Sequence, residues 1–375
     1  NAGSFWTWRE AMYGLVERAT PELVEAVSRA AFEEMLDAGI TTVGEFHYLH
    51  HAAPAGRDWS LDAAVRRAAA AAGIRLVLIE VAYLHGGIDE PLAGGQRRFD
   101  GGSVAEVVGR LDALAADLDP AREHLAASAH SVRAVTPEEL AELHAAVRDR
   151  GLPLHLHLEE QPAEIEACRA RHGVGPIALV CDTIAVDGSV VAVHATHTRP
   201  EDFQRWGAAG GGVCLCPLTE ANLGDGLADG PAMSAAGIEP SLGTDSNARI
   251  SMLEEMRWME LGQRLRSGRR GVFRDAGGTV APRLLRAATE RGAAALGIPA
   301  GVIRPGMLAD LVRIDLTHPA IAGIPAEELD AAVVFGAGDE VIEATAVGGR
   351  WRPRRDLRSR SDAAAASIAP MTGSP

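Results

Sequence analysis

Short apolar runs alternate with amphipathic, helix-like segments along most of the chain. The runs lack the regular polar alternation of a half-exposed strand, which favours strands that are buried on both faces of a parallel sheet. The seven runs span residues 39–46, 73–84, 124–130, 152–159, 190–196, 211–217 and 239–246. Seven strand-then-helix units are one fewer than a (β/α)8 barrel contains, so we predict an α/β fold of this barrel type.

The segments between the runs carry helix start and stop signals. The segment 20–39 opens with Thr-Pro-Glu, which is an N-cap followed by a proline in the first turn, and it closes with glycine. The segment 136–151 repeats this arrangement. Each segment is therefore predicted to form a helix that begins after its threonine and stops before its glycine.

The pattern changes near residue 300. Residues 301–353 are strand-like and rich in turn residues, which predicts a small accessory sheet. From residue 354 the chain is dominated by arginine, serine and alanine, and we predict a disordered tail over 354–375. The predicted organisation is a barrel over residues 1–300, then the small sheet, then the tail.

The composition is that of a globular protein. The 375 residues, 47% of them hydrophobic, are enough to bury a large core. No run approaches the ~18 apolar residues of a membrane span, and no charged segment leads into an apolar one as in a signal peptide. The four cysteines are expected to be reduced thiols. We predict a cytoplasmic protein with no membrane partner.

The charge of the chain and its lack of lysine exclude several classes of binding partner and reaction. The net charge is −15, and all 36 basic residues are arginines. A strongly acidic protein repels phosphate backbones, which excludes nucleic acid as a partner. The absence of lysine excludes Schiff-base chemistry and the P-loop. A site for an anion must therefore be built from arginine, whose planar fork suits carboxylates.

Ionisable residues lie where the predicted strands end. His157, His194 and Asp245 come at the ends of three different runs, and Glu160 follows shortly after the first of them. In a parallel barrel these strand ends form the catalytic face. Histidine and aspartate there can bind zinc, and a nearby glutamate can carry a proton. The set predicts a metal-dependent hydrolase.

Longer motifs extend this prediction. Between residues 5 and 260 the chain carries "FWTWREAMY", "EFHYLHH", "HSVRAV", "HLHLEEQP", "VHATHT", "CPLTEANLGDG" and "GTDSNARISMLEEMRWME", and "PGMLADLVRID" follows near residue 305. Together these motifs resemble the amidohydrolase superfamily and are similar to its N-formimino-L-glutamate deiminase family. The resemblance implies a metal-dependent barrel, with residues 301–353 as the C-terminal part of a small β-sandwich.

The resemblance also implies a reaction and a site. The reaction is the hydrolysis of N-formimino-L-glutamate to N-formyl-L-glutamate and ammonia, in histidine degradation. His157 and Asp245 are implied as metal ligands, with Asp245 also accepting a proton during catalysis. Glu160 is implied as the proton shuttle, and His194 as the group that orients or polarises water and substrate. The implied substrate-binding residues are Arg9, Tyr48, His130 and Arg133. The family also suggests a homodimer.

The implied substrate is a small molecule with two carboxylates, and two arginines suit it. Arg9 alone would be interpreted as a surface helix residue, whereas the position of Arg133 in a strand-end loop favours a functional role. Superfamily members with two bridged metals use a carboxylated lysine, which this sequence lacks. The resemblance therefore implies one divalent metal ion, with zinc as the first choice.

The sequence departs from the family at its start. The family's first strand ends in a His-x-His metal pair, and no such strand precedes "NAGSFWTW". We therefore expect the first barrel strand to be missing from this chain, with weak metal binding and little activity. An alternative places the pair at His155 and His157, but the order of the later strands argues against it. His47, His50 and His51 are metal-like in composition, and we expect them to support their loop rather than bind a metal.

Two other functions stay open. A related amidohydrolase or deaminase would act on another amidine or on an aromatic base, which needs no pair of arginines such as Arg9 and Arg133. A non-catalytic, truncated remnant would bind a ligand or a partner without turnover.

Overall fold

The computed structural model describes residues 12–53 and 56–355. Its main feature is a seven-stranded parallel sheet in which each strand pairs with the next one along the chain. The strands are β1 (Thr42–His47), β2 (Arg75–Ala82), β3 (Glu123–Ser131), β4 (Leu154–Leu158), β5 (Val190–His194), β6 (Gly212–Leu215) and β7 (Ser241–Leu242). Each strand overlaps one predicted run, so the interpretation of the apolar pattern is confirmed.

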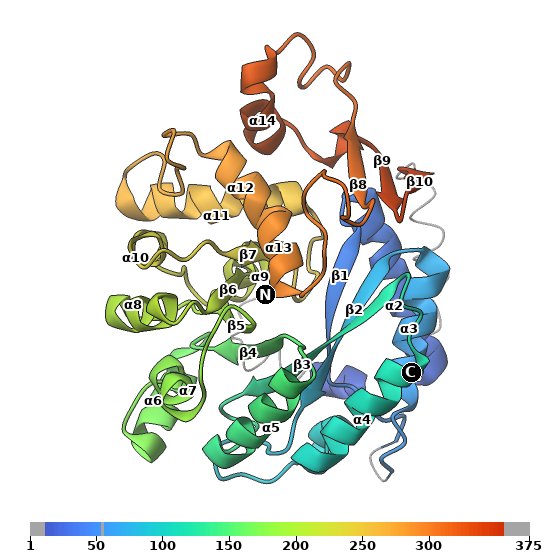
Figure 1. Ribbon diagram of the computed structural model, residues 1–375, viewed down its shortest axis with the longest axis vertical. Coiled ribbons are helices and arrows are strands. Elements are labelled where there is room, and N and C mark those ends of the chain that lie inside the picture. Colours follow the sequence, from blue (N-terminus) through green and yellow to red (C-terminus); the bar gives the residue numbers. More distant parts are fainter. Residues whose placement is uncertain (1–11, 54–55, 356–375) are drawn as a thin grey trace.

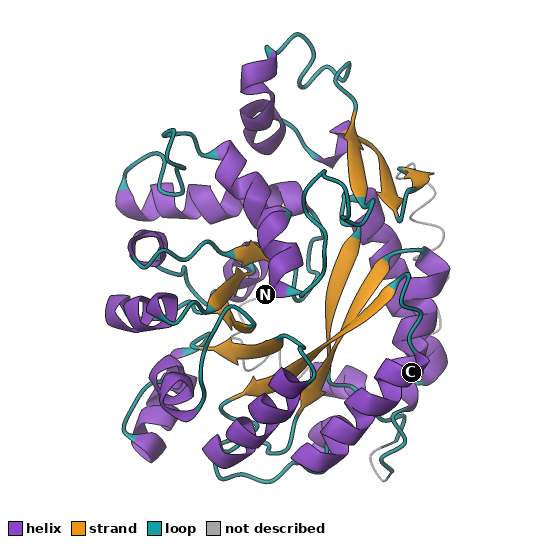
Figure 2. Ribbon diagram, in the orientation of Figure 1, coloured by secondary structure: helices purple, strands orange, loops and turns teal. Residues whose placement is uncertain are grey.

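The sheet curls into an open barrel, and the helices cover its outer side (Figures 1 and 2). The longer helices are α2 (Pro21–Asp37), α3 (Ser60–Ala72), α4 (Val104–Asp117), α5 (Pro137–Asp149), α6 (Pro162–His172), α7 (Pro176–Thr183), α8 (Pro200–Ala208), α11 (Met252–Ser267) and α12 (Ala281–Ala288). The shorter helices are α9 (Pro217–Leu223), α10 (Gly230–Ala235), α13 (Glu290–Ala295) and α14 (Leu329–Ala331). Among the described strands no pairing joins β7 to β1. The α/β barrel prediction is confirmed, as an open barrel of seven strands.

The helix boundaries follow from local hydrogen bonds. Thr20 caps α2 by accepting the N–H of Leu23 at 3.2 Å. At α5, Thr136 accepts the N–H of Glu139 at 3.2 Å, and the Glu139 carboxylate accepts the N–H of Thr136 at 2.7 Å. This reciprocal pair satisfies two backbone donors that the first helical turn leaves free. Both predicted helices are confirmed.

Strands β1 and β2 turn alternate side chains to opposite faces of the sheet. Phe46 and Ile79 belong to a cluster inside the barrel, together with apolar residues of α13 and the turn after it. Leu78 instead packs with residues of α2 and α3 on the outer face. His47 and Glu80 stand next to Phe46 and Ile79 and are paired in register, so both face the outer helices.

A small antiparallel sheet lies beyond one end of the barrel strands, in the upper right of Figure 1. Its strands are β8 (Leu311–Ile314), β9 (Ile342–Val347) and β10 (Arg350–Pro353), in the order β10-β9-β8. Arg75 of β2 donates to both carboxylate oxygens of Asp310, at 2.6 and 3.0 Å. Both side chains are almost fully buried, so this ion pair fixes the small sheet to the barrel.

The boundaries 1–300 and 301–353 stay a prediction, as does disorder over 354–375. Two residues of that predicted tail make defined contacts, because Arg354 and Arg355 donate to Asp37 of α2. Residues 356–375 lie outside the described part of the chain. None of the described helices is long and apolar enough to cross a membrane.

Candidate active site

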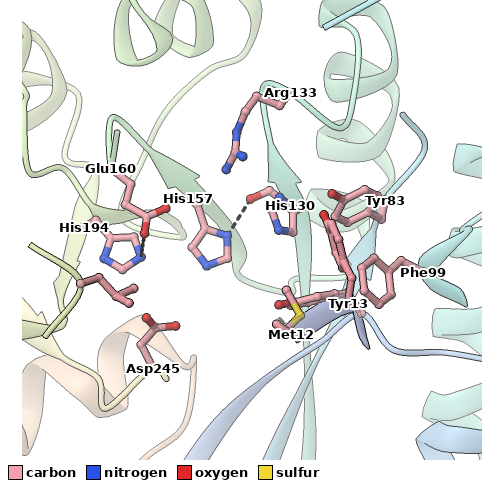
Figure 3. Close-up of a pocket in the computed structure, with 12 residues that line it drawn as sticks. Met12, Tyr13, Tyr83, Phe99, His130, Arg133, His157, Glu160, His194 and Asp245 are labelled. Carbon is pink, nitrogen blue, oxygen red and sulfur yellow. Dashed lines mark hydrogen bonds and ion pairs between the residues drawn. The ribbon is translucent and has the colours of Figure 1, made fainter. Parts of the chain in front are cut away.

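A pocket opens at the carboxyl ends of the barrel strands. One side is polar and is formed by His130, Arg133, His157, Glu160, His194 and Asp245. The other side is mostly aromatic and includes Met12, Tyr13, Tyr83 and Phe99, while Tyr48 and Leu223 complete the lining. Figure 3 shows Glu160, His194 and Asp245 on one side of His157, and the aromatic residues on the other side. The structure thus brings seven of the eight predicted site residues to one cavity. Arg9 lies outside the described residues.

The backbone bends sharply where the polar side chains leave the strands. His194 at the end of β5 has φ +72°, and Asp245 just after β7 has φ +42°. Glu159, next to the predicted proton shuttle, has φ +57°. L-residues rarely adopt this left-handed conformation, and such strain gathers at functional sites because the surrounding structure must hold it. These bends aim the side chains into the pocket.

Three donors converge on one point. Ring nitrogens of His157 and His194 and a carboxylate oxygen of Asp245 all lie within 4.8 Å of one another. The two imidazole rings are stacked, with centroids 5.5 Å apart and planes 19° apart. His157 donates through Nδ1 to the carbonyl of His130 at 2.9 Å, which leaves Nε2 free for a metal. The three residues fit a divalent metal ion.

His194 is held in the same way by a residue that the sequence did not single out. Its Nδ1 donates to Oε1 of Glu220 in α9 at 3.3 Å, and the same oxygen accepts the N–H of Cys216 at 2.9 Å. Glu220 is buried. A carboxylate behind a metal-binding histidine fixes the ring and makes its other nitrogen a better ligand. Only the fold reveals this role, because Glu220 stands 26 residues from His194.

Opposite electrostatic effects act on the two stacked histidines. Burial and the nearby His194 lower the pKa of His157 to about 3. Burial also acts to lower the pKa of His194, but the carboxylates of Glu160, Glu220 and Asp245 outweigh it and raise that pKa to about 10. The site therefore presents a neutral imidazole beside a strongly acidic environment, and that environment attracts a cation.

Glu160 lies beside His194, on the same side of His157 as Asp245 (Figure 3). Its Oε1 lies 4.0 Å from Nε2 of His194, and its side chain is only 8% exposed. Burial raises the pKa of this carboxyl above the ordinary value of glutamate. A carboxyl with a raised pKa is suited to exchanging protons near neutral pH.

Asp225 is a second buried carboxyl with a raised pKa. Burial raises its pKa to about 7, and Asp225 accepts a hydrogen bond from Gln161.

The remaining predicted residues line the substrate side. Arg133 is half-buried at the end of β3, and its Nε donates to Glu164 at 3.4 Å. Tyr48 packs edge-on against His130, with ring centroids 5.4 Å apart. In Figure 3 the guanidinium of Arg133 points toward the space between His157 and His130. A carboxylate of a ligand in this pocket would find the Arg133 guanidinium within reach.

Tyr13, Tyr48, Tyr83 and Phe99 form an aromatic wall of the pocket, and of these four residues the sequence predicted only Tyr48. Tyr13 and Tyr83 each accept a hydrogen bond from the Gln96 amide at 3.3 Å, which ties both hydroxyls to one donor. Phe99 packs on Tyr83 at 5.3 Å. The signal for Tyr83 was its place in the run 73–84, directly after the last strand residue. In sequence it resembles an ordinary core aromatic.

His155, the other histidine of β4, lies outside the pocket lining. Its Nε2 contacts the backbone carbonyl of Ala295 at 3.0 Å, and the side chain is buried. Burial lowers the pKa of His155 to about 4, so the ring is neutral. The prediction that His155 and His157 do not form one metal pair agrees with this arrangement.

Comparison with known proteins identifies the family. The sequence profile of the amidohydrolase family matches residues 1–352. The chain belongs to the amidohydrolase family. This amidohydrolase is 39% identical over 99% of its length to the formimidoylglutamate deiminase of Pseudomonas aeruginosa, and it covers 82% of that protein. It is 28% identical over 92% of its length to the 8-oxoguanine deaminase of the same organism, and it covers 75% of that protein.

Solved structures share the fold. The crystal structure of an amidohydrolase from Brucella melitensis matches with a TM-score of 0.88 and 32% identity, over 99% of this chain and 84% of that one. An adenosine deaminase from Xanthomonas campestris, solved with bound zinc, matches with a TM-score of 0.81 and 22% identity, over 99% and 81% of the two chains. The amidohydrolase type of barrel is therefore confirmed.

Proposed function

We propose that this amidohydrolase hydrolyses N-formimino-L-glutamate to N-formyl-L-glutamate and ammonia, a step of histidine degradation. The observation that carries the proposal is the 39% identity to a formimidoylglutamate deiminase over 99% of the chain. The pocket supports it, because Arg133 and three metal donors line the same cavity. A dicarboxylate with a hydrolysable C–N bond needs a cationic contact and a polarising group.

We infer that zinc is the ion and that His157, His194 and Asp245 hold it. Two imidazoles and one carboxylate, with a position left open, are one of the donor sets of catalytic zinc sites. Both histidines use Nδ1 for hydrogen bonds to His130 and Glu220, so each can offer Nε2 to the ion. When bound, zinc supplies a Lewis acid that polarises the substrate and lowers the pKa of water.

Glu160 moves the protons of the reaction. Water adds to the formimino carbon and loses one proton, and the imino nitrogen gains one. The second proton of the water reaches the same nitrogen as the C–N bond breaks, the formyl C=O forms and ammonia leaves. The buried Glu160 carboxyl, whose pKa is raised by burial, can accept and return both protons. Asp245, on the opposite side of His194 in Figure 3, is the second carboxylate able to accept a proton.

Arg133, Tyr48 and His130 bind the substrate in this proposal. The Arg133 guanidinium pairs with one carboxylate, and the hydroxyl of Tyr48 and the ring of His130 supply neutral hydrogen bonds. Arg9 is the expected partner of the second carboxylate and lies outside the described residues.

A deaminase of an aromatic base is the second candidate. The observation in its favour is the aromatic wall of Tyr13, Tyr48, Tyr83 and Phe99, on which a flat heterocycle could stack. Arg133 argues against it, because a neutral base has no carboxylate to pair with a half-buried guanidinium.

A substrate series distinguishes the two candidates. Zinc-loaded protein is assayed for ammonia release from N-formimino-L-glutamate, from N-formiminoglycine, which lacks the side-chain carboxylate, and from 8-oxoguanine. The proposal predicts the highest kcat/KM for the dicarboxylate and a loss of about 10-fold or more for the glycine analogue, the cost of one charge-assisted contact. A higher kcat/KM for 8-oxoguanine would overturn it.

A further inference from the structure

Four ionisable side chains meet outside the catalytic pocket, between the sheet and its helical cover. His47 ends β1, His50 lies in the loop after it, Asp62 lies in the first turn of α3, and Glu80 lies in β2. The exposed fraction is 4% for His47 and 0% for the other three residues. Phe46, beside His47, points to the opposite face and packs against His157, with ring centroids 4.2 Å apart and planes tilted by 49°. The sheet therefore separates this cluster from the catalytic donors.

The donor atoms of the cluster converge. Those of His47, His50 and Asp62 lie within 4.8 Å of one another. His50 Nδ1 is 3.6 Å from Oδ1 of Asp62 and 3.4 Å from Oε1 of Glu80, and His47 Nε2 is 2.9 Å from the same Asp62 oxygen. A tetrahedral ion with bonds of ~2.0–2.2 Å holds its ligand atoms about 3.3–3.6 Å apart. The separations around His50 match that spacing, whereas His47 Nε2 and Asp62 Oδ1 lie at hydrogen-bond distance and would have to move apart slightly to share an ion.

Hydrogen bonds leave the centre of the cluster unsatisfied. Within the described chain, His50 Nδ1 and both carboxylate oxygens of Glu80 have no hydrogen-bond partner. Folded proteins rarely leave such buried atoms without one, because a carboxylate without a partner loses its hydration at high cost. A cation between His50, Asp62 and Glu80 would give both His50 Nδ1 and the Glu80 carboxylate a partner.

The outer atoms of the same side chains are already engaged. His50 donates through Nε2 to the carbonyl of Val81 at 3.0 Å. Arg110 of α4 donates through Nε to Oδ2 of Asp62 at 2.6 Å. Such contacts fix the tautomer of a ligating histidine and the orientation of a ligating carboxylate. They leave His50 Nδ1 turned toward the centre, next to Asp62 Oδ1, which accepts a hydrogen bond from His47.

We propose that His47, His50, Asp62 and Glu80 bind a second divalent transition-metal ion, separate from the catalytic one. Two imidazoles and two carboxylates favour zinc over calcium or magnesium, which prefer oxygen ligands alone. The two carboxylates oppose the charge of the ion, although Arg110 offsets part of the charge of Asp62. The proposal does not rest on the deiminase function.

The ion would connect β1, β2, α3 and the loop after β1, because each of these elements supplies one of its ligands. The loop after His47 carries Tyr48 into the catalytic pocket before the chain returns to His50. The histidines of "EFHYLHH" are metal-like in composition, but the sequence led us to expect them only to support the loop. The proposal departs from that expectation, and no local motif in the sequence points to it, because Asp62 and Glu80 come from other elements.

The test measures metal content in protein that lacks the catalytic donors. The chain with His157→Asn and Asp245→Asn is purified from zinc-supplemented cells, dialysed against a weak chelator and analysed by mass spectrometry for metal. We expect about one equivalent of zinc to remain per chain. Adding His50→Gln or Glu80→Gln lowers this content at least about tenfold. Adding His144→Gln, which alters a buried histidine of α5, leaves it unchanged.

A second measurement avoids any dependence on how the cluster variants fold. The same background protein, with the cluster intact, is refolded with cobalt(II) and its visible spectrum recorded. The proposal predicts the intense absorption of four-coordinate cobalt with nitrogen and oxygen ligands. Background protein that holds neither zinc nor four-coordinate cobalt would overturn the proposal, as would zinc that persists unchanged in folded His50→Gln and Glu80→Gln chains. The cluster would then be a hydrogen-bonded network with a proton on Glu80.

Discussion

Replacing Glu160 by glutamine should separate proton transfer from metal binding. The variant keeps the size of the side chain and removes its charge and its ability to carry protons. A positioned general acid–base residue contributes about 10²–10⁴-fold to the rate, which corresponds to ~2.7–5.4 kcal/mol of the barrier. We therefore expect kcat to fall by that factor while the zinc content stays at the wild-type level.

The distance between Glu160 and His194 gives a second expected effect of the same substitution, a fall in the pKa of His194. Oε1 of Glu160 lies 4.0 Å from Nε2 of His194. Unit charges at that separation interact by about 4 kcal/mol at an effective dielectric constant of about 20, which corresponds to roughly 3 pKa units. In metal-free Glu160→Gln protein, the pKa of His194 should therefore fall from about 10 by roughly that amount, because a stabilising anion is lost.

Two assays check this pair of expectations. Steady-state ammonia release gives kcat, and a histidine-resolved NMR titration of the metal-free protein gives the pKa of His194. Glu166→Gln, an exposed glutamate of α6, is the matched control and should change neither quantity. A kcat within tenfold of the wild type, at equal zinc content, would refute the assignment of Glu160 as the proton carrier. An unchanged His194 titration would refute the electrostatic argument.

Three further predictions concern binding, pH and stability. Arg133→Gln should lower kcat/KM by about 10- to 150-fold through loss of a charge-assisted contact worth ~1.5–3 kcal/mol, whereas Arg171→Gln, at an exposed ion pair, should leave steady-state kinetics unchanged. Burial raises the pKa of Glu255 to about 9. The contribution of the protonated Glu255 to the stability of the wild type is therefore fully present below pH 4.5, near the pKa of the unfolded chain, and is lost as the pH rises toward 9. Glu255→Gln should therefore unfold like the wild type at pH 5 and be more stable by at least about 1.4 kcal/mol at pH 8, one pKa unit in energy, and equal denaturation midpoints at both pH values would contradict this. Asp310→Ala should cost about 3–5 kcal/mol because it leaves a buried arginine charge unpaired, whereas Glu343→Gln, at a half-exposed pair, should cost at most about 1 kcal/mol in the same urea titration.

The barrel and the three metal-binding candidates of the site could be predicted from the sequence for one physical reason. Apolar runs of strand length, each followed by a helix, imply a parallel sheet, and all the strands of such a sheet end on one face. Polar residues at those ends, such as His157, His194 and Asp245, must therefore meet. The seven strands and the shared pocket confirm this reasoning.

The parts that the sequence did not predict depend on contacts between distant elements. Glu220 supports His194 from a helix that has no motif of its own, and Tyr83 looks like a core aromatic until its neighbours are placed. The last predicted run, 239–246, forms a strand only at Ser241–Leu242. The left-handed bend at Asp245 takes the chain out of extended conformation soon after it. The homodimer, the cytoplasmic location and the low activity expected for this chain stay predictions.

The most direct test of the account is the identification of products from N-formimino-L-glutamate. Purified protein with added zinc is incubated with this substrate, and ammonia and N-formyl-L-glutamate are followed together by NMR. The account predicts that both products appear in equal amounts, that they require zinc, and that Glu160→Gln abolishes nearly all of the rate. Zinc-loaded, folded protein that leaves N-formimino-L-glutamate intact, or that releases ammonia without N-formyl-L-glutamate, would contradict it.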